Sequence, residues 1–207
     1  LNELRDFDTW TSREQEEALG WYRACVTKKV QREPMPDGSP PLVVSKNPAF
    51  SQKITYLRKT FPKAMFVYLV RNPLRTIPSR LSLIQEIWRH RFPDFTNMSE
   101  EQVETILQDS FNTYLCAERD LTDVPRGEKL ILTYDEFSSA PGKAVAQLYQ
   151  HFNLPGPPPE LEAELSRLDE SQPHRSSGHR YSLADFGLAE ERIREALALV
   201  FEKYGFD

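Results

Sequence analysis

The hydrophobic positions of the chain form two kinds of pattern. Three short apolar runs, rich in valine, isoleucine and leucine, predict β-strands at Leu42–Ser45, Met65–Val70 and Lys129–Thr133. Apolar residues at helical spacing predict helices around these runs, at residues 12–30, 50–61, 73–88, 99–121, 141–152 and 189–204. Short strands interspersed with helices predict an α/β protein.

Two of these helices begin with a capping-box signal, in which a serine is followed three residues later by glutamine. Ser12 and Gln15 open the first helix, and Ser99 and Gln102 open the helix over residues 99–121. Between these regions, residues 33–41 are rich in proline and glycine and are predicted to form a loop, as is the polar, basic stretch over residues 172–181.

Two of the predicted strands are followed by the same pattern, a basic residue and then Asn-Pro. Lys46-Asn47-Pro48 follows the first strand and Arg71-Asn72-Pro73 follows the second. Because asparagine is a good N-cap and proline suits the first helical position, a helix should begin directly after each strand. Two strand–helix units about 25 residues apart are typical of neighbouring parallel strands with a crossover helix. Both junctions would then lie at the carboxyl edge of the sheet, where open α/β sheets bind ligands.

The second junction has the features of an anion site. The N–H groups of a first helical turn are unpaired and the helix dipole is positive there. Arg71 can add a two-pronged donor to a phosphate, and Ser79, two turns into the helix, adds a hydroxyl. The alternative is an ordinary strand–helix junction whose arginine faces solvent.

Composition narrows the class of protein. With 207 residues the chain is long enough for one sizeable core, and we expect a single domain over residues 1–207. Its net charge of −5 argues against a general nucleic-acid binder. The isolated Cys25 and Cys116 lack metal-site spacing and are expected to be reduced and buried. No apolar run could span a bilayer and no signal peptide is visible, so we expect a cytoplasmic protein.

The residues at both junctions resemble a known family. Arg71-Asn72-Pro73 followed by Ser79 resembles the 3′-phosphate motif of sulfotransferases that use 3′-phosphoadenylyl sulfate (PAPS). Residues 46–50, Lys-Asn-Pro-Ala-Phe, resemble the Lys-Thr-Pro-Ala-Phe/Tyr segment of carbohydrate-type and bacterial members. Residues 130–155 and 179–188 also resemble parts of that family, so the likeness extends over most of the chain.

This resemblance implies a fold, a reaction and roles for particular residues. The expected fold is a P-loop-NTPase-like three-layer α/β arrangement, with a mostly parallel sheet between helices. The donor would be PAPS and the product PAP (adenosine 3′,5′-bisphosphate), with no metal. Arg71 and Ser79 would bind the 3′-phosphate, and Lys46 would neutralise charge on the leaving phosphate oxygen. For His179 and Arg180, contact with the nucleotide phosphate and a solvated loop are equally good interpretations.

The sequence also departs from the family pattern. The Pro-x-Ser/Thr-Gly-Thr/Ser loop that holds the 5′-phosphosulfate has no counterpart in it, so we expect this chain to be the C-terminal portion of the domain. Asn47 stands where threonine or serine is usual, and Arg75 where many members have an acidic residue. Pro78, inside the predicted helix, should loosen its first turns. No general base can be assigned, because His90 is expected at a solvated helix end and His151 in a structural position.

These observations leave three readings of function. The leading one is sulfuryl transfer from PAPS to a hydroxyl or amine of a carbohydrate, lipid or small metabolite. The second is a non-catalytic PAP-binding or scaffolding relative that lacks the donor loop. The third, a P-loop kinase relative, would need a GxxxxGK[ST] loop, which does not occur in this sequence.

Overall fold

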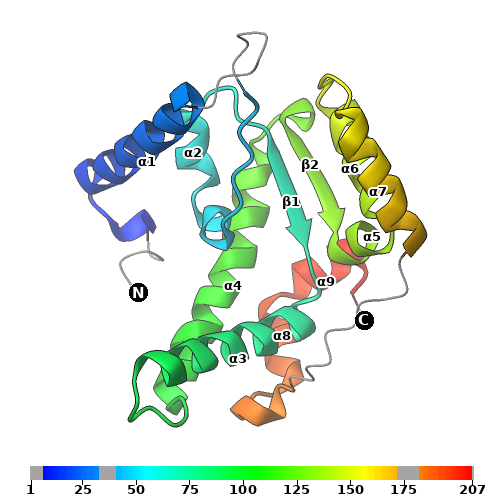
Figure 1. Ribbon diagram of the computed structural model, residues 1–207. Helices are drawn as coiled ribbons and strands as arrows, with labels where there is room; N and C mark the ends of the chain where they lie inside the picture. The colour runs from blue at the N-terminus through cyan, green and yellow to red at the C-terminus, as the bar shows by residue number, and fades with distance from the viewer. Residues whose placement is uncertain (1–6, 33–40, 172–181, 207) are drawn as a thin grey trace. The chain divides into compact units, whose positions relative to one another are not determined.

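The computed structural model describes residues 7–32, 41–171 and 182–206 (Figure 1). These residues form α-helices, short 3₁₀ helices (η) and two β-strands, which confirms the α/β class. In chain order the elements are η2 Phe7–Thr9, α1 Ser12–Arg32, η3 Pro48–Gln52, α2 Ile54–Thr60, β1 Phe66–Val70, α3 Pro73–Arg91, α4 Glu100–Thr122, η4 Arg126–Glu128, β2 Lys129–Thr133, α5 Tyr134–Ser139, α6 Pro141–His151, α7 Pro159–Ser171, η5 Ala184–Phe186, α8 Glu190–Ala196 and α9 Ala198–Tyr204.

The chain divides into two compact units. The first contains residues 1–64 together with 115–123, and the second contains residues 65–114 together with 124–207. Helix α4 therefore contributes its residues up to Tyr114 to the second unit and those from Leu115 to the first. The units are described separately below.

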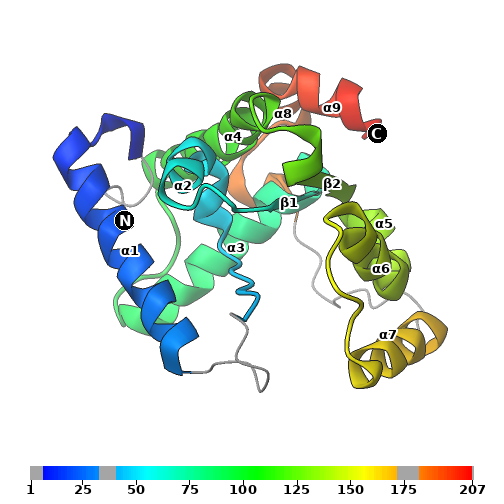
Figure 2. The ribbon, with the colours of Figure 1, turned by 90° about the horizontal axis from the view of Figure 1, so that it is seen from above.

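A two-stranded parallel sheet lies at the centre of the second unit. β1 and β2 pair from Phe66 opposite Lys129 to Val70 opposite Thr133. Figure 2 shows helices on both sides of it, with α8 and α9 on one side and α6 on the other. Side-chain packing supports this arrangement of helices on the two faces of the sheet. Val70 belongs to a cluster with residues of α3, α4, α8 and α9, whereas Leu130 and Leu132 pack with α6.

The main core of this unit forms from the helical stripes that the sequence predicts. The buried residues of this core, which form one cluster with Val70 of β1, are Val70, Ile77, Leu81, Val103, Ile106, Leu107, Phe111, Tyr114, Ile193, Leu197, Val200 and Phe201. The capping box at the start of α4 is confirmed, since Gln102 N–H donates to Ser99 Oγ and Ser99 N–H donates to the Gln102 side chain. The C-terminal stripe is also confirmed, although the helix breaks at Leu197 into α8 and α9.

In the first unit, the predicted first helix forms but its cap differs from the prediction. Thr11, not Ser12, is the capping residue: Glu14 N–H donates to Thr11 Oγ1, and Glu14 Oε2 accepts from Thr11 N–H at 2.8 Å. The threonine and glutamate provide the same capping-box chemistry one position earlier. No side chain of α1 is fully buried, and Cys25, expected in the core, is exposed.

The prediction of a strand at Leu42–Ser45 is wrong. Residues 41–47 form no strand and take no part in the ladder between β1 and β2, and Val44 is 86% exposed. The contact of this segment with α1 is a side-chain one, in which Tyr22 Oη donates to Ser45 Oγ at 2.6 Å. The predicted neighbour of this segment, β1, instead pairs with β2, which lies about 60 residues further along the chain. An isolated segment cannot satisfy the hydrogen-bonding groups of a strand, so its valines alone do not make it one. The predicted helix over residues 50–61 also divides, into η3 and α2, at Lys53.

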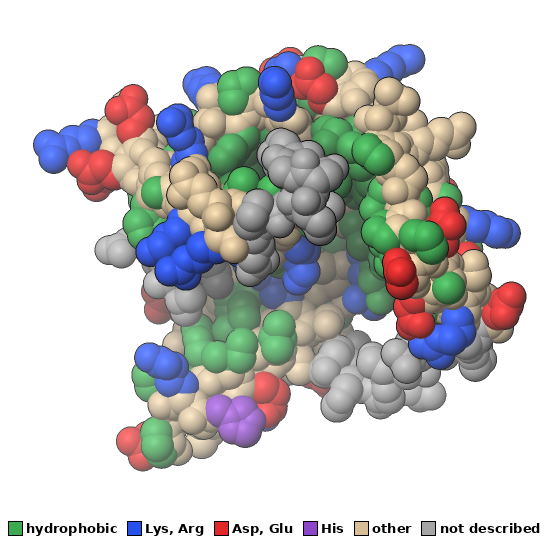
Figure 3. All heavy atoms as spheres, turned by 45° about the horizontal axis from the view of Figure 1, so that its top comes forward, with side chains coloured by type: hydrophobic (Ala, Val, Ile, Leu, Met, Phe, Trp, Pro, Cys, Tyr) green, Lys and Arg blue, Asp and Glu red, His purple; other side chains and the backbone are tan. Residues whose placement is uncertain are grey.

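Hydrophobic side chains reach the surface between charged ones (Figure 3). Within the second unit, Val67 and Leu69 of β1 are 45% and 39% exposed, although their register partners Leu130 and Leu132 are buried beneath α6. One face of β1 is therefore less covered than the same face of β2. No helix in the described part of the chain combines the length and the apolar character needed to cross a bilayer.

Candidate functional site

The junction between β1 and α3 has the backbone form predicted for it. Asn72 caps α3, and Pro73 occupies the first helical position. Leu74 N–H donates to Asn72 Oδ1 at 2.9 Å, and Arg75 and Thr76 N–H both lie 3.0 Å from Asn72 O. This corrects one expectation: the first-turn N–H groups are already paired within the junction. An anion here would therefore be bound by side chains and attracted by the helix dipole.

The Arg71 side chain is a half-buried cation with its hydrogen-bond donors available. Its guanidinium forms no hydrogen bond or ion pair with any residue in the described ranges. Its Cζ atom instead lies 4.5 Å from the centre of the Tyr134 ring. Stacking against a ring face leaves the N–H groups at the edge of a planar guanidinium free to donate. Arg71 can thus offer the paired donors that phosphate oxygens accept.

The backbone of Arg71 is held by a residue from α4. Tyr114 Oη donates to Arg71 O at 2.7 Å. The phenol is 6% exposed, and burial raises the pKa of Tyr114 to about 12, so it stays a donor at neutral pH. The sequence placed Tyr114 only on a core face. Nothing in its neighbourhood along the chain indicates this contact, which joins residues 43 positions apart.

Ser79 lies on α3, in the same unit as Arg71. It is half-buried, and its hydroxyl forms no hydrogen bond within the described part of the chain, so it can still bind a ligand. The next residue, Arg80, forms an ion pair with Asp109 and donates to Ser110 Oγ at 3.0 Å. This contact with α4 fixes the part of α3 on which Ser79 sits.

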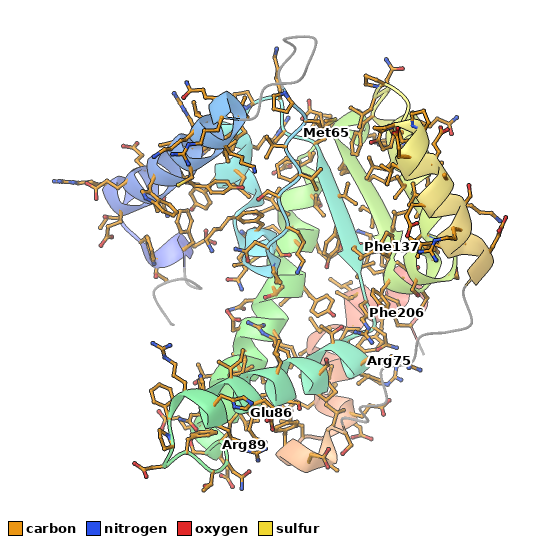
Figure 4. The ribbon with its side chains drawn as sticks, in the orientation of Figure 1. Met65, Arg75, Glu86, Arg89, Phe137 and Phe206 are labelled. Carbon is orange, nitrogen blue, oxygen red and sulfur yellow. The ribbon has the colours of Figure 1, made fainter. Side chains whose placement is uncertain are left out.

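Pro78 and Arg75 are the two departures from the family pattern on this helix. Pro78 is buried, and α3 continues without a break on both sides of it, from Pro73 to Arg91. Arg75 is exposed in the first turn, just beyond the carboxyl end of β1, whereas Met65 marks the other end of that strand (Figure 4). Arg75 therefore adds a second positive charge near the junction, where an acidic residue would have opposed anion binding.

Lys46 belongs to the first unit. It is exposed and directly precedes Asn47, the cap of η3, whose side chain accepts from Ala49 N–H at 3.0 Å. Its ammonium group has no partner among the described residues. The Asn-Pro signal after Lys46 is thus confirmed as a cap. Whether Lys46 acts at a sulfuryl group stays a prediction, and His179 and Arg180 lie outside the described residues.

The remaining candidates have structural or solvent-exposed positions. His151 Nε2 lies 3.0 Å from Arg126 O and 2.8 Å from Lys129 O, so it joins the end of α6 to the start of β2. His90 is exposed near the end of α3. Within the described ranges, no three His, Cys, Asp or Glu side chains are grouped so as to hold a metal.

A groove of about 980 Å³ lies within the first unit, between α1 and α2. Its wall includes the cationic Arg23, Lys28 and Lys59 and the apolar Leu19. None of the predicted site residues lines it.

Comparison with known proteins decides the family. A sequence model of the sulfotransferase family matches residues 5–158, a range that contains Lys46, Arg71 and Ser79. The chain belongs to the sulfotransferase family. It is 26% identical, over 172 residues, to the omega-hydroxy-beta-dihydromenaquinone-9 sulfotransferases Stf3 of Mycobacterium bovis and Mycobacterium tuberculosis. The match covers 80% of this chain but 41% of each relative, so the chain spans about two-fifths of their length. No solved structure matches the chain.

Proposed function

We propose that this chain provides the 3′-phosphate-binding part of a sulfotransferase that uses PAPS. The observation on which this rests is the Arg71 guanidinium, half-buried at the carboxyl end of β1 with no acidic partner in the described chain. Ser79, on the helix that begins there, provides a hydroxyl. The family match supports the sulfuryl-transfer chemistry, and the site supports the binding of a phosphate.

The reaction would proceed by attack of an acceptor oxygen or nitrogen on the sulfur of PAPS. A bond from the acceptor to sulfur forms, the bond from sulfur to the bridging phosphate oxygen breaks, and PAP leaves with the electron pair of that bond. Negative charge grows on the departing phosphate, and Lys46 is our candidate for neutralising it. Arg71 and Ser79 would hold the other end of the nucleotide, and the acceptor proton would pass to a base that these residues do not identify.

The fold proposal follows from the same family. We infer that β1 and β2 belong to a larger sheet in a P-loop-NTPase-like three-layer fold. Among the described residues each strand has one partner, so each keeps an edge at which another strand could pair. Val67 and Leu69 remain exposed on a face that a helical layer would cover. The single domain over residues 1–207 and the cytoplasmic location stay predictions of the sequence.

Among the acceptors, we favour a hydroxyl group of a lipid. The Mycobacterium relatives are named for a hydroxylated dihydromenaquinone, which is a lipid-like acceptor. At 26% identity this supports the class of acceptor and not the individual molecule.

Titration calorimetry with PAP tests the proposal. We expect micromolar binding to the chain, and a loss of about tenfold to a hundredfold in Arg71→Ala, because hydrogen bonds to a charged group are worth about 1.5–3 kcal/mol. Arg91→Ala is the matched control, since Arg91 is exposed at the opposite end of α3. Equal binding by Arg71→Ala and Arg91→Ala would contradict the assignment of the 3′-phosphate site.

The non-catalytic alternative makes a different prediction. A binding or scaffolding relative would bind PAP through Arg71 but would release no PAP from PAPS in the presence of a hydroxylated lipid. Following PAP release by chromatography separates it from the enzyme.

A further inference from the structure

The first unit carries a long stretch of positive charge, of which the proposed function uses only Lys46. Residues 18–32 and 41–64 contain no aspartate or glutamate, although the whole chain has a net charge of −5. Their nine basic residues are Arg23, Lys28, Lys29, Arg32, Lys46, Lys53, Arg58, Lys59 and Lys63. We propose that this unit docks on the surface of an anionic membrane through the outer face of α1.

The inner side of α1 packs within the unit. Tyr22 lies on this side, and its ring centre is 5.5 Å from that of Phe50 and 5.7 Å from that of Phe61. Leu19 and Val26, on the same apolar stripe, are half-buried. Figure 1 shows α2 beside α1. The apolar stripe of α1 is therefore occupied by contacts inside the unit, and another side of the helix is left for a partner.

The outer face of α1 consists of Trp21, Cys25, Lys28 and Arg32, all of which are exposed. Their spacing of four, three and four residues places them on one side of a helix. Trp21 is 71% exposed, although tryptophan is a residue that proteins mostly bury. Lys28 and Arg32 form no ion pair within the described part of the chain. An exposed tryptophan beside unpaired cations is typical of helices that lie at a membrane interface, where lipid phosphates attract the cations.

The helix dipole accounts for only part of this charge. Lys29 and Arg32 lie in the last turn of α1, where cations complement the negative pole of a helix. That effect falls off within one turn, so it does not explain Arg23 or the five basic residues of 41–64. The positive charge extends over more of the unit than the stability of α1 requires, and a surface of one sign attracts a partner of the other.

Two further features favour a bilayer over a soluble polyanion. Tyr22 Oη donates to Ser45 Oγ at 2.6 Å, and this bond ties the segment that contains residues 42–44 to α1. The side chains of these three residues, one leucine and two valines, are exposed. Aliphatic side chains gain from contact with acyl chains but have no partner on a nucleic-acid backbone. The groove between α1 and α2 likewise combines cations, among them Lys28 and Lys59, with apolar side chains, which suits an anionic amphiphile.

This docking goes beyond the proposed function and does not depend on it. The basic surface belongs to the first unit, whereas Arg71 and Ser79 belong to the second. If both proposals hold, the chain works at the surface in which a lipid acceptor is dissolved.

Co-sedimentation with lipid vesicles tests the inference. Vesicles of phosphatidylcholine alone are compared with vesicles in which about one-third of the lipid is anionic phosphatidylglycerol. We expect the full chain to bind the anionic vesicles alone, and to be released as NaCl rises from about 0.05 M to about 0.5 M, because salt screens the attraction. Lys28→Gln combined with Arg32→Gln should weaken binding by about tenfold to thirtyfold, since each cation near such a surface contributes about fivefold.

A matched pair of substitutions controls for net charge. Arg91→Gln combined with Arg126→Gln removes the same charge from exposed positions of the second unit, and should change vesicle binding by less than about twofold. Equal losses in the two double variants would overturn the inference, because net charge and not the face of α1 would then decide binding. Wild-type protein that does not bind anionic vesicles would overturn it as well.

Tryptophan fluorescence tests which face docks. Phosphatidylglycerol vesicles with brominated acyl chains should quench the emission of Trp21, and this quenching should disappear in Trp21→Phe, which keeps Trp10 and Trp88. Quenching that persists in Trp21→Phe would overturn the inference. So would a single-stranded oligonucleotide that binds through Lys28 and Arg32 as tightly as the vesicles do, since it would assign the surface to nucleic acid.

PAP titration on the same proteins keeps the two proposals apart. The double variant at Lys28 and Arg32 should bind PAP as the wild type does, because its substitutions lie in the unit that lacks Arg71. Loss of vesicle binding with PAP binding intact therefore supports docking by α1, and PAP binding without any vesicle binding by the wild type overturns the docking alone.

Discussion

Two junctions of this chain share a local pattern, a basic residue followed by Asn-Pro, but have different structures. After residues 42–45 comes Lys46-Asn47-Pro48, and after residues 65–70 comes Arg71-Asn72-Pro73. Both asparagines cap the helix that follows, with side-chain acceptors 3.0 and 2.9 Å from the N–H two residues later. At the first junction the preceding segment is exposed and forms no strand, and the helix is a five-residue 3₁₀ helix. The second junction has a paired strand and a 19-residue α-helix.

The difference shows which parts of a strand–helix junction are local. A cap needs only its own side chain and the next turn, so both asparagines form one. A strand needs a partner, and β1 has one in β2. A long helix needs an apolar face to bury, which α3 has through Ile77 and Leu81. The following predictions test this comparison, beginning with the largest expected effect.

Removing a buried side chain of α3 should destabilise the second unit strongly. Leu81 is completely buried, so Leu81→Ala should lower the free energy of unfolding by about 2–5 kcal/mol. The matched control is Leu83→Ala, on the same helix but 60% exposed, for which we expect a change within about 0.5 kcal/mol. Urea unfolding followed by circular dichroism measures both. Similar losses would show that burial does not explain the length of α3.

Removing the hydroxyl of Tyr114 should destabilise the second junction in a pH-dependent way. Tyr114→Phe leaves the Arg71 carbonyl without its partner, and we expect a loss of about 1–3 kcal/mol at neutral pH.

Because burial raises the pKa of Tyr114 to about 12, the unfolded chain loses this proton first as the pH rises. The stability that the phenol contributes is therefore fully present below about pH 10, its ordinary pKa, and is lost as the pH rises towards 12. The stability difference between wild type and Tyr114→Phe should shrink across that window. A difference that stays constant between pH 8 and 12 would contradict the assignment.

The two caps should contribute nearly equally to the free energy of unfolding. Asn47→Ala and Asn72→Ala should each cost about 0.5–2 kcal/mol, because each leaves one first-turn N–H without its side-chain acceptor. Replacing the same residues by aspartate keeps an acceptor and should restore most of the loss. If only Asn72→Ala had an effect, the cap at Asn47 would depend on tertiary structure and the comparison would fail.

The smallest effect is expected in the exposed segment of the first junction. Val44 is 86% exposed, so Val44→Ala should change the free energy of unfolding by less than about 0.5 kcal/mol. Val70, completely buried at the corresponding place in the second junction, serves as the contrasting site. A loss of 1 kcal/mol or more at Val44, by urea unfolding, would mean that this segment is packed in solution, as about that much follows from burying a methyl group.

Much of the second unit could be predicted from sequence, because its strand propensity, its caps and its apolar stripes all indicate the same elements. The strand at β1, the cap at Asn72, the stripe through Ile77 and Leu81 and the capping box at Ser99 all appear as expected. The candidate site combines local signals with contacts from distant parts of the chain. Arg71 and Ser79 follow from their spacing along one strand and one helix and from the family resemblance, and their phosphate-binding role stays a prediction. The contacts that Tyr114 and Tyr134 make with Arg71 were not predicted, because each tyrosine reaches Arg71 from a different element.

The sequence by itself determined the local features of this protein: which residues cap helices, which faces are apolar, and the resemblance that the family match confirms. These depend on side chains within a few residues of one another. Only the tertiary structure decided that β1 pairs with β2 and that residues 42–45 pair with no described strand. It also decided that Arg71 lies between two tyrosines. Strand partners and contacts across a sheet edge form between residues 43 to 63 positions apart, where the energy comes from burial and pairing that no local pattern specifies.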